Sequence, residues 1–189
     1  MAVHFCLHFM KNSPHLPALP TAEDANIARF AAVAIALSVI EAAIPSPILG
    51  VKLGLANCVI LLCFQRYGLK VAAWVNGLRI LGFGLLFGSL FTPGFMLSLV
   101  GGAASFVGLG AYMALPKKYF GLISASLLAA WGHILGQLVF ARYYLLPSDS
   151  ILYLLPFFAF SATVTGVFNG IVVQFLLQKY TQIQKDFAP

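Results

Sequence analysis

The sequence predicts an all-α integral membrane protein with six transmembrane helices and both termini in the cytoplasm. Of its 189 residues, 61% are hydrophobic and only 8% are charged, whereas soluble domains carry about 25% charged residues. So few charges cannot cover the surface of a soluble protein, which excludes that class. Six apolar stretches separated by helix breakers supply the spans, and basic residues concentrated on one side of them set the orientation.

The six apolar stretches alternate with proline, glycine and charged residues. They are residues 26–44, 50–64, 70–91, 94–115, 120–145 and 151–177. A spanning helix needs about 20 residues, so the second stretch is short. Because it also carries Lys52 and Asn57, we expect it to be tilted, partly unwound or lining a cavity. The predicted organisation is a cytoplasmic tail over 1–25, a six-helix transmembrane domain over 26–178 and a second cytoplasmic tail over 179–189.

The basic residues predict the orientation, because cytoplasmic loops carry an excess of lysine and arginine. With a cytoplasmic N-terminus, Lys52 and Arg142 lie near the outer face and eight basic residues lie inside. These eight are Lys11, Arg29, Arg66, Lys70, Lys117, Lys118, Lys179 and Lys185. An even number of spans returns the C-terminus to the cytoplasm. The net charge of +6 is therefore explained by topology, and no nucleic-acid partner is expected.

Small residues recur four apart on several predicted helices, a spacing that lets helix backbones approach closely in lipid. The first helix carries an alanine stripe, Ala28, Ala32 and Ala36. The glycine pairs are Gly84–Gly88, Gly132–Gly136 and Gly166–Gly170. We interpret the glycine pairs as internal packing. The alanine stripe leaves two alternatives open, internal packing or contact with a partner subunit.

Arg79 raises the main functional question, because it falls in the middle of an apolar run. A charge at the bilayer centre costs roughly 2.5–3.5 kcal/mol on insertion scales, so the guanidinium needs an anion, a polar cavity or both. Polar residues at similar or more outward depth are Glu41, Lys52, Asn57, Asn76, His133 and Gln137. One alternative is a structural ion pair of Glu41 with Lys52 or Arg79. The other is an outward pocket whose surplus of positive charge favours a carboxylate or phosphate ligand.

Motifs for catalysis are missing from the sequence. There is no GxxxxGK[ST] phosphate-binding loop, no GxSxG and no HExxH. Five acidic residues provide no aspartate-rich motif for a magnesium-bound diphosphate, and the intramembrane Glu41 and His133 are too few for a metal cage. The three cysteines do not form a disulfide pattern. We therefore expect a protein that is not an enzyme and that has no cofactor and no metal.

Several segments together resemble the Gx transporter family, which is also labelled heptaprenyl diphosphate synthase component I. The resemblance covers about residues 27–175, and GVKLGLAN and LRILGFG are its most specific pieces. Where the family typically has an asparagine after the histidine of helix 5, this chain has Ile134. The segments are LSVIEAAIPSPILGVKLGLANCVILL, NGLRILGFGLLFG, FMLSLVGGAASF, WGHILGQL and YLLPFFAFSATVTGVFNG.

The resemblance implies a fold like the substrate-binding S component of energy-coupling factor (ECF) transporters in the bacterial cytoplasmic (inner) membrane. Such a subunit contacts a transmembrane coupling subunit through the alanine stripe, and that subunit carries two ATPases. The implied ligand is a small anionic vitamin or precursor, either isoprenoid- or quinone-related or flavin-like. The alternative is a non-transporting membrane subunit of a redox or isoprenoid/quinone-synthesis assembly.

Overall fold

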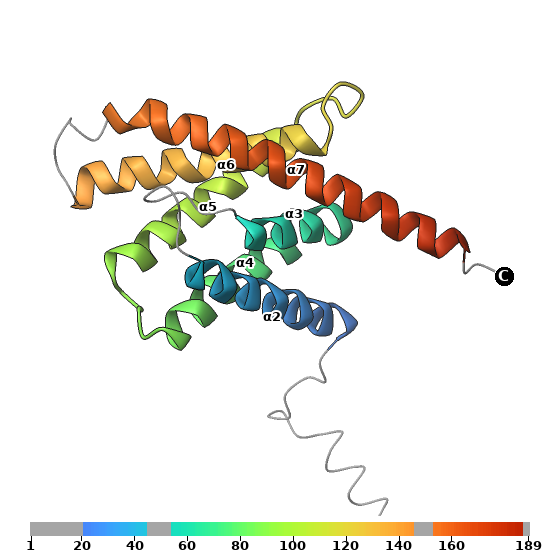
Figure 1. The fold of residues 1–189 in the computed structure, drawn as a ribbon, viewed down its shortest axis with the longest axis horizontal. Coiled ribbons are helices and arrows are strands. Elements are labelled where there is room, and N and C mark those ends of the chain that lie inside the picture. The colour runs from blue at the N-terminus through green and yellow to red at the C-terminus, as the bar shows by residue number, and fades with distance from the viewer. Residues whose placement is uncertain (1–20, 45–53, 146–152, 187–189) are drawn as a thin grey trace, which may run out of the picture.

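The computed structural model describes residues 21–44, 54–145 and 153–186, and these residues form helices and short connections without a strand (Figure 1). The predicted all-α class is confirmed for this part of the chain. Lys52 and nearly all of the predicted N-terminal tail lie outside the described residues. The elements are α2 (Ala22–Ala43), α3 (Leu55–Tyr67), α4 (Leu69–Leu86), α5 (Pro93–Met113), α6 (Leu122–Phe140), η1 (Ala141–Leu145) and α7 (Leu155–Asp186).

Local sequence signals explain where two of these helices begin. Thr21 caps α2: its side chain accepts a hydrogen bond from the Asp24 amide, and the Asp24 carboxylate accepts one from the Thr21 amide. This reciprocal capping box satisfies amides that a helix start leaves unpaired. Thr92 caps α5 in the same way by accepting from the Phe95 amide, and Pro93 occupies the first turn, where no amide hydrogen is needed. Helix α2 therefore begins four residues before the apolar stretch that predicted it.

The helices form two groups that meet along the middle of the molecule. α2, α3 and α4 pack on one another, and α6 packs between α5 and α7. Contacts of α3 with α7 and of α4 with α5 join the groups. Figure 1 shows the start of α2 and the end of α7 on the same side of the bundle, while α3 does not reach the opposite side. We call the side with these chain ends the near side and the other the far side.

Within the described ranges, five helices are long and apolar enough to cross a membrane, and Leu55–Tyr67 is a shorter apolar helix. Large apolar side chains face outward at helical spacing, as expected for contact with lipid tails. Such outward stripes run along α4, α6 and α7. They comprise Trp74, Leu78, Leu81 and Leu85; Trp131, Leu135 and Val139; and Phe160, Val164, Phe168, Ile171 and Phe175. The chain is a multi-pass membrane protein.

The short helix α3 lies at the centre of the buried core. Seven of its thirteen residues are buried, and Cys63, Val75 of α4 and Val173 of α7 are the largest fully buried side chains. The core therefore fills the half of the bundle that α3 occupies. Helix α3 begins partway along the bundle. On its far side, none of the described residues forms a central helix against which the surrounding helices could pack.

Two of the three predicted glycine pairs lie at helix contacts. A Cβ on Gly132 would lie 2.6 Å from the carbonyl oxygen of Ala104, so α6 approaches α5 closely there. Gly166 and Gly170 of α7 face α6 in the same manner. The prediction for Gly84–Gly88 is wrong, because Gly88 lies beyond the end of α4 with φ of 60° and has no neighbour within 4 Å of a built Cβ. That glycine allows a turn instead.

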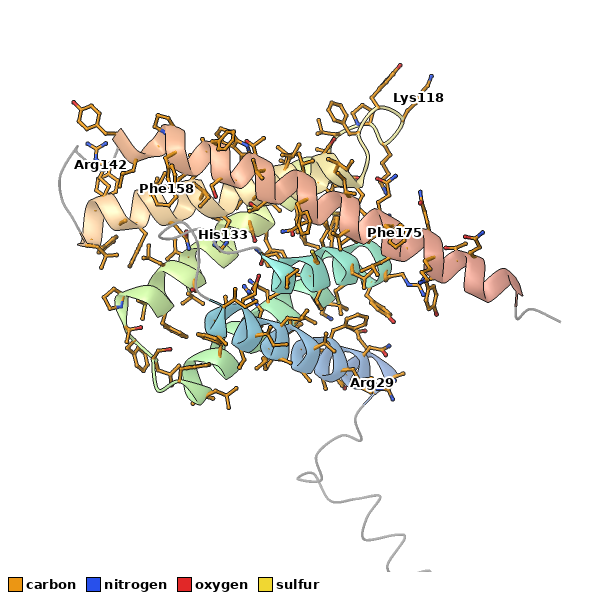
Figure 2. The ribbon with its side chains drawn as sticks, viewed as in Figure 1. Arg29, Lys118, His133, Arg142, Phe158 and Phe175 are labelled. Atoms are coloured by element: carbon orange, nitrogen blue, oxygen red, sulfur yellow. The ribbon has the colours of Figure 1, made fainter. Side chains whose placement is uncertain are left out.

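The alanine stripe of α2 is exposed in this chain. Ala28, Ala32 and Ala36 all face outward, whereas Ala31 and Ala34 on the other face of the helix are buried. Of the two interpretations of the stripe, internal packing is therefore wrong for the described bundle. Figure 2 shows Arg29 and Lys118 toward the near side and Arg142 at the far side, which matches the predicted segregation of basic residues.

Candidate functional site

A cavity of about 450 Å³ occupies the far half of the bundle, beyond the start of α3. Small-molecule sites in proteins typically measure about 300–1,000 Å³. Its walls come from α2, α4, α5, α6 and α7, together with the first residues of α3. Its polar lining residues are Ser38, Glu41, Asn57, Arg79, Ser89, Thr92, Ser98, His133, Gln137, Ser161, Thr165 and Asn169, and its large apolar ones are Ile80, Phe83, Phe95, Ile134 and Phe158. We call it the large cavity.

A second cavity of about 50 Å³ adjoins the first. Four residues with polar side chains line both cavities and so mark the boundary between them: Asn57, Arg79, His133 and Asn169. Asn76, Ser105 and Ser126 line only the second cavity, which we call the small cavity. Five helices, α3 to α7, contribute to it.

Arg79 is the charged residue at this boundary. Its Nη2 donates to Oδ1 of Asn76 over 2.9 Å, a bond between residues three apart on one face of α4. Its Nε is buried and has no hydrogen-bond partner within the part of the chain that the structure describes. No ion pair joins Arg79 to any acidic residue in the described part of the chain. A buried donor left without an acceptor costs about 1–3 kcal/mol, more for a charged group.

Glu41 forms no ion pair with Arg79 and is instead bound to a backbone amide. Its Oε1 accepts a hydrogen bond of 2.5 Å from the Leu55 amide, the first residue of α3. Gly54 precedes that residue with φ of 75° and has no side chain to cap the helix. The carboxylate of α2 therefore supplies the cap for α3, where the helix dipole favours a negative charge. The predicted alternative of a Glu41–Arg79 pair is wrong in this structure, and its Lys52 counterpart lies outside the described residues.

His133 and Gln137 lie one turn apart on α6 and face α5. The Gln137 side-chain amide donates to the carbonyl oxygen of Leu97 over 3.3 Å. Gly101 makes room for both residues, since a Cβ built there would lie 2.9 Å from the His133 ring and 2.8 Å from Gln137. Figure 2 shows His133 in the interior of the molecule, away from both ends. A small residue on α5 thus lets two polar side chains enter the bundle.

The described residues of the predicted binding set lie around these two adjoining cavities. Glu41, Asn57, Arg79, His133 and Gln137 line the large cavity, and Asn76 lines the small one. Whether they bind a substrate remains a prediction. The predicted binding set did not include Asn169, which is buried and whose Oδ1 accepts from the Cys58 thiol over 3.2 Å. Its position in an apolar run was a usable signal. The lining serines and threonines carried no such signal, because they also occur throughout ordinary membrane helices.

The residues that line the two cavities can recognise an anion. The Arg79 side chain lines both cavities, and asparagine and serine side chains around it offer further hydrogen bonds. The described residues contain no group of three or more His, Cys, Asp or Glu that could hold a metal ion. The Arg79 guanidinium can therefore recognise a negatively charged group within a cavity of small-molecule size.

Comparison with known proteins gives one result. The family model described as heptaprenyl diphosphate synthase component I matches residues 30–176, which is well over half of the chain and includes every described residue of the site. Searches of curated proteins and of solved structures found no match. The resemblance seen in the sequence is confirmed: the chain belongs to the heptaprenyl diphosphate synthase component I family.

Proposed function

We propose that this protein is the substrate-binding membrane subunit of an ATP-driven importer of the ECF type, and that it captures a small anionic vitamin or precursor. The observation that carries the proposal is the buried Arg79 Nε without a partner, at the wall of a cavity of about 450 Å³. A structural arginine in a membrane protein normally satisfies its donors within the protein. An incompletely paired guanidinium on a residue that lines both cavities supports a ligand that brings its own acceptor.

The cavity residues favour binding over a synthase activity. Binding and ionising a prenyl diphosphate calls for carboxylates that hold magnesium, since magnesium in such sites takes carboxylate and phosphate oxygens. Among the described lining residues Glu41 is the only acid, and the start of α3 already engages it. We therefore propose a subunit that is not itself an enzyme, with an isoprenoid- or quinone-related precursor or a flavin-like molecule as ligand.

The exposed stripe of Ala28, Ala32 and Ala36 is the proposed contact for a transmembrane coupling subunit. Small side chains on an exposed helix face allow another helix to approach closely in lipid. The sequence has no phosphate-binding loop, so two separate ATPase chains, docked on the coupling subunit, would supply the energy. In the bacterial cytoplasmic membrane, with both termini inside, the large cavity would face outward for capture. Reorientation of the subunit would then release the ligand inside.

A binding experiment tests this proposal. Native mass spectrometry of the purified protein in mild detergent would look for a retained small molecule. Arg79→Ala should reduce retention about 10–100-fold, because a hydrogen bond to a charged group contributes about 1.5–3 kcal/mol. Unchanged retention in this variant would remove Arg79 from the binding site and refute the pocket assignment.

A second pair of variants tests the partner surface. Ala32→Leu should keep ligand retention but lose co-purification with a coupling subunit and ATPases. Ala103→Leu is the matched control, because Ala103 is also exposed but lies on α5. If both variants retain the partners equally, α2 is not the docking helix.

The family name favours a second candidate, a non-transporting membrane subunit of an isoprenoid, quinone or redox assembly. In that case the alanine stripe would hold a fixed partner and the polar residues would join helices. Purification from native membranes separates the two candidates. An importer subunit should co-purify with ATPases, whereas the alternative predicts synthase or redox subunits and no ATPase.

A further inference from the structure

The division of the site into two unequal cavities carries an inference about the chemical class of the ligand. We propose that the ligand is an amphipathic monocarboxylate whose carboxylate enters the small cavity and whose larger body fills the large cavity. This inference rests on the proposed function, and it narrows the broad class of anionic ligands to one head group. Three properties of the small cavity support it: its donors, its size and its charge.

The donors of the small cavity are fixed by the chemistry of arginine. A guanidinium has only N–H donors, so Asn76 must turn its oxygen toward Nη2 of Arg79, as the 2.9 Å bond requires. The Asn76 amide nitrogen then lies on the opposite side, where it is 2.7 Å from a Cβ built on Gly102. Gly102 lines the small cavity. Arg79 and Asn76, which both line the small cavity, thus bring guanidinium and amide N–H groups to it from one face of α4.

Size limits which anionic group can reach these donors. A volume of about 50 Å³ holds about three to five water-sized positions at roughly 10–15 Å³ each. A carboxylate or a single phosphoryl group fits that space. A diphosphate, with roughly twice the heavy atoms of one phosphate, exceeds it. The diphosphate in the family name is therefore excluded as the group bound here.

The charge of the cavity lining then favours a carboxylate over a phosphate as the head group of the ligand. Arg79 is the only residue with a permanent positive charge in the described lining of either cavity. A phosphate monoester carries about −1.5 to −2 at neutral pH, which leaves an unbalanced charge in an enclosed site. A carboxylate matches one guanidinium. Glu41, on the wall of the large cavity, disfavours a second negative charge on the ligand's body.

The body is expected to be partly aromatic. Phe83, Phe95 and Phe158 line the large cavity, together with serine and threonine hydroxyls from three helices. Aromatic rings offer wide apolar contact, and scattered hydroxyls fix orientation through hydrogen bonds. A ring-bearing monocarboxylate of vitamin size satisfies both.

Head-group probes test the inference on the purified full-length protein in nanodiscs. The probes are phenylbutyrate, phenylbutanamide and phenylbutyl phosphate, which share one body, and binding is read from the rise in the thermal unfolding midpoint. Wild-type protein should prefer the carboxylate over the amide by about tenfold. In Arg79→Gln, which keeps side-chain polarity without the charge, the preference should fall to within about twofold.

A filling variant addresses the small cavity itself. Ser126 is buried and lines only that cavity, so Ser126→Leu should weaken binding of both the carboxylate and the amide probe and remove the difference between them. If this variant does not fold, Arg79→Gln alone decides. Tighter binding of the phosphate, or a carboxylate preference that survives Arg79→Gln, would overturn the inference while the capture function stands.

Analysis of the molecule retained by the native protein completes the test. A single carboxylate on that molecule supports the inference, and a phosphate, a diphosphate or a neutral head group overturns it. If the wild-type protein retains no molecule and none of the three probes raises its unfolding midpoint, the proposed capture function itself fails. The failure of the inference and the failure of the function therefore give different results.

Discussion

Replacing Gly132 with alanine tests the close approach of α5 and α6 beside the site. A Cβ on Gly132 would lie 2.6 Å from the carbonyl oxygen of Ala104, and ordinary contacts begin at 3.4 Å. The obstacle is backbone, so no side chain can rotate away. The two helices must instead move apart by about 0.8 Å, a gap that forfeits roughly a quarter to a half of each affected contact.

The magnitude follows from this geometry. Overpacking of this kind costs about 1–3 kcal/mol. Gly110→Ala is the matched control, because it makes the same change on α5 where a Cβ meets nothing within 4 Å. That control should gain up to about 1 kcal/mol from the better helix propensity of alanine. Gly132→Ala makes the same gain, so the two variants should differ by the overpacking cost alone, roughly 1–3 kcal/mol, or about 2–12 °C in unfolding midpoint for a chain of this size.

Thermal unfolding of purified protein, followed by tryptophan fluorescence, measures the difference. His133 directly follows Gly132, so separation of the helices also moves its ring away from Gly101, and ligand retention should fall together with stability. Equal unfolding midpoints for Gly132→Ala and Gly110→Ala would refute the close contact.

Three further predictions concern the ends of helices and the orientation. Glu41→Gln should lower the free energy of unfolding by about 0.3–1 kcal/mol, because the α3 start loses a negative charge; an unchanged denaturation midpoint would contradict this cap. Arg66→Ala removes a cation–π contact of 4.4 Å between the guanidinium and the Tyr180 ring. Amide hydrogen exchange in the last turns of α7 should therefore accelerate by about twofold to fivefold. Equal exchange rates in the two proteins would show that this contact does not stabilise the end of α7. With the native cysteines replaced, an impermeant maleimide should label Ser89→Cys in intact cells and Lys118→Cys only after permeabilisation, and the reverse pattern would invert the predicted orientation.

Much of the fold follows from hydropathy alone, because apolar length and breakers are what a bilayer selects. The helix ends depend on finer interactions. The capping box at Thr21 is readable in the sequence as T-x-x-D, yet it lies in a segment whose prolines suggested an unstructured tail. The start of α3 cannot be read in this way, since its cap is the Glu41 carboxylate from another helix. A tertiary contact sets that boundary.

The sequence predicted which residue types lie in the site and at what depth, but not which of these side chains pair with one another. Arg79 and Asn76 are three apart, so helical periodicity alone brings them together. Glu41 was the expected counter-charge because it is the only acid among the apolar stretches. Sequence distance could not reveal that a backbone amide of α3 would hold it instead. The small cavity was equally hidden, because it exists where five helices leave a gap.

The pairing of Glu41 with a helix end explains why Arg79 remains available. If the carboxylate had joined the guanidinium, both charges would be balanced and a ligand would first have to break that pair. Here the helix dipole and the Leu55 amide stabilise the carboxylate, and one amide oxygen holds only part of the guanidinium. The buried Nε lowers the stability of the empty protein by about 1–3 kcal/mol. Under the proposed binding function, a ligand whose acceptor reached this donor would recover that free energy on binding.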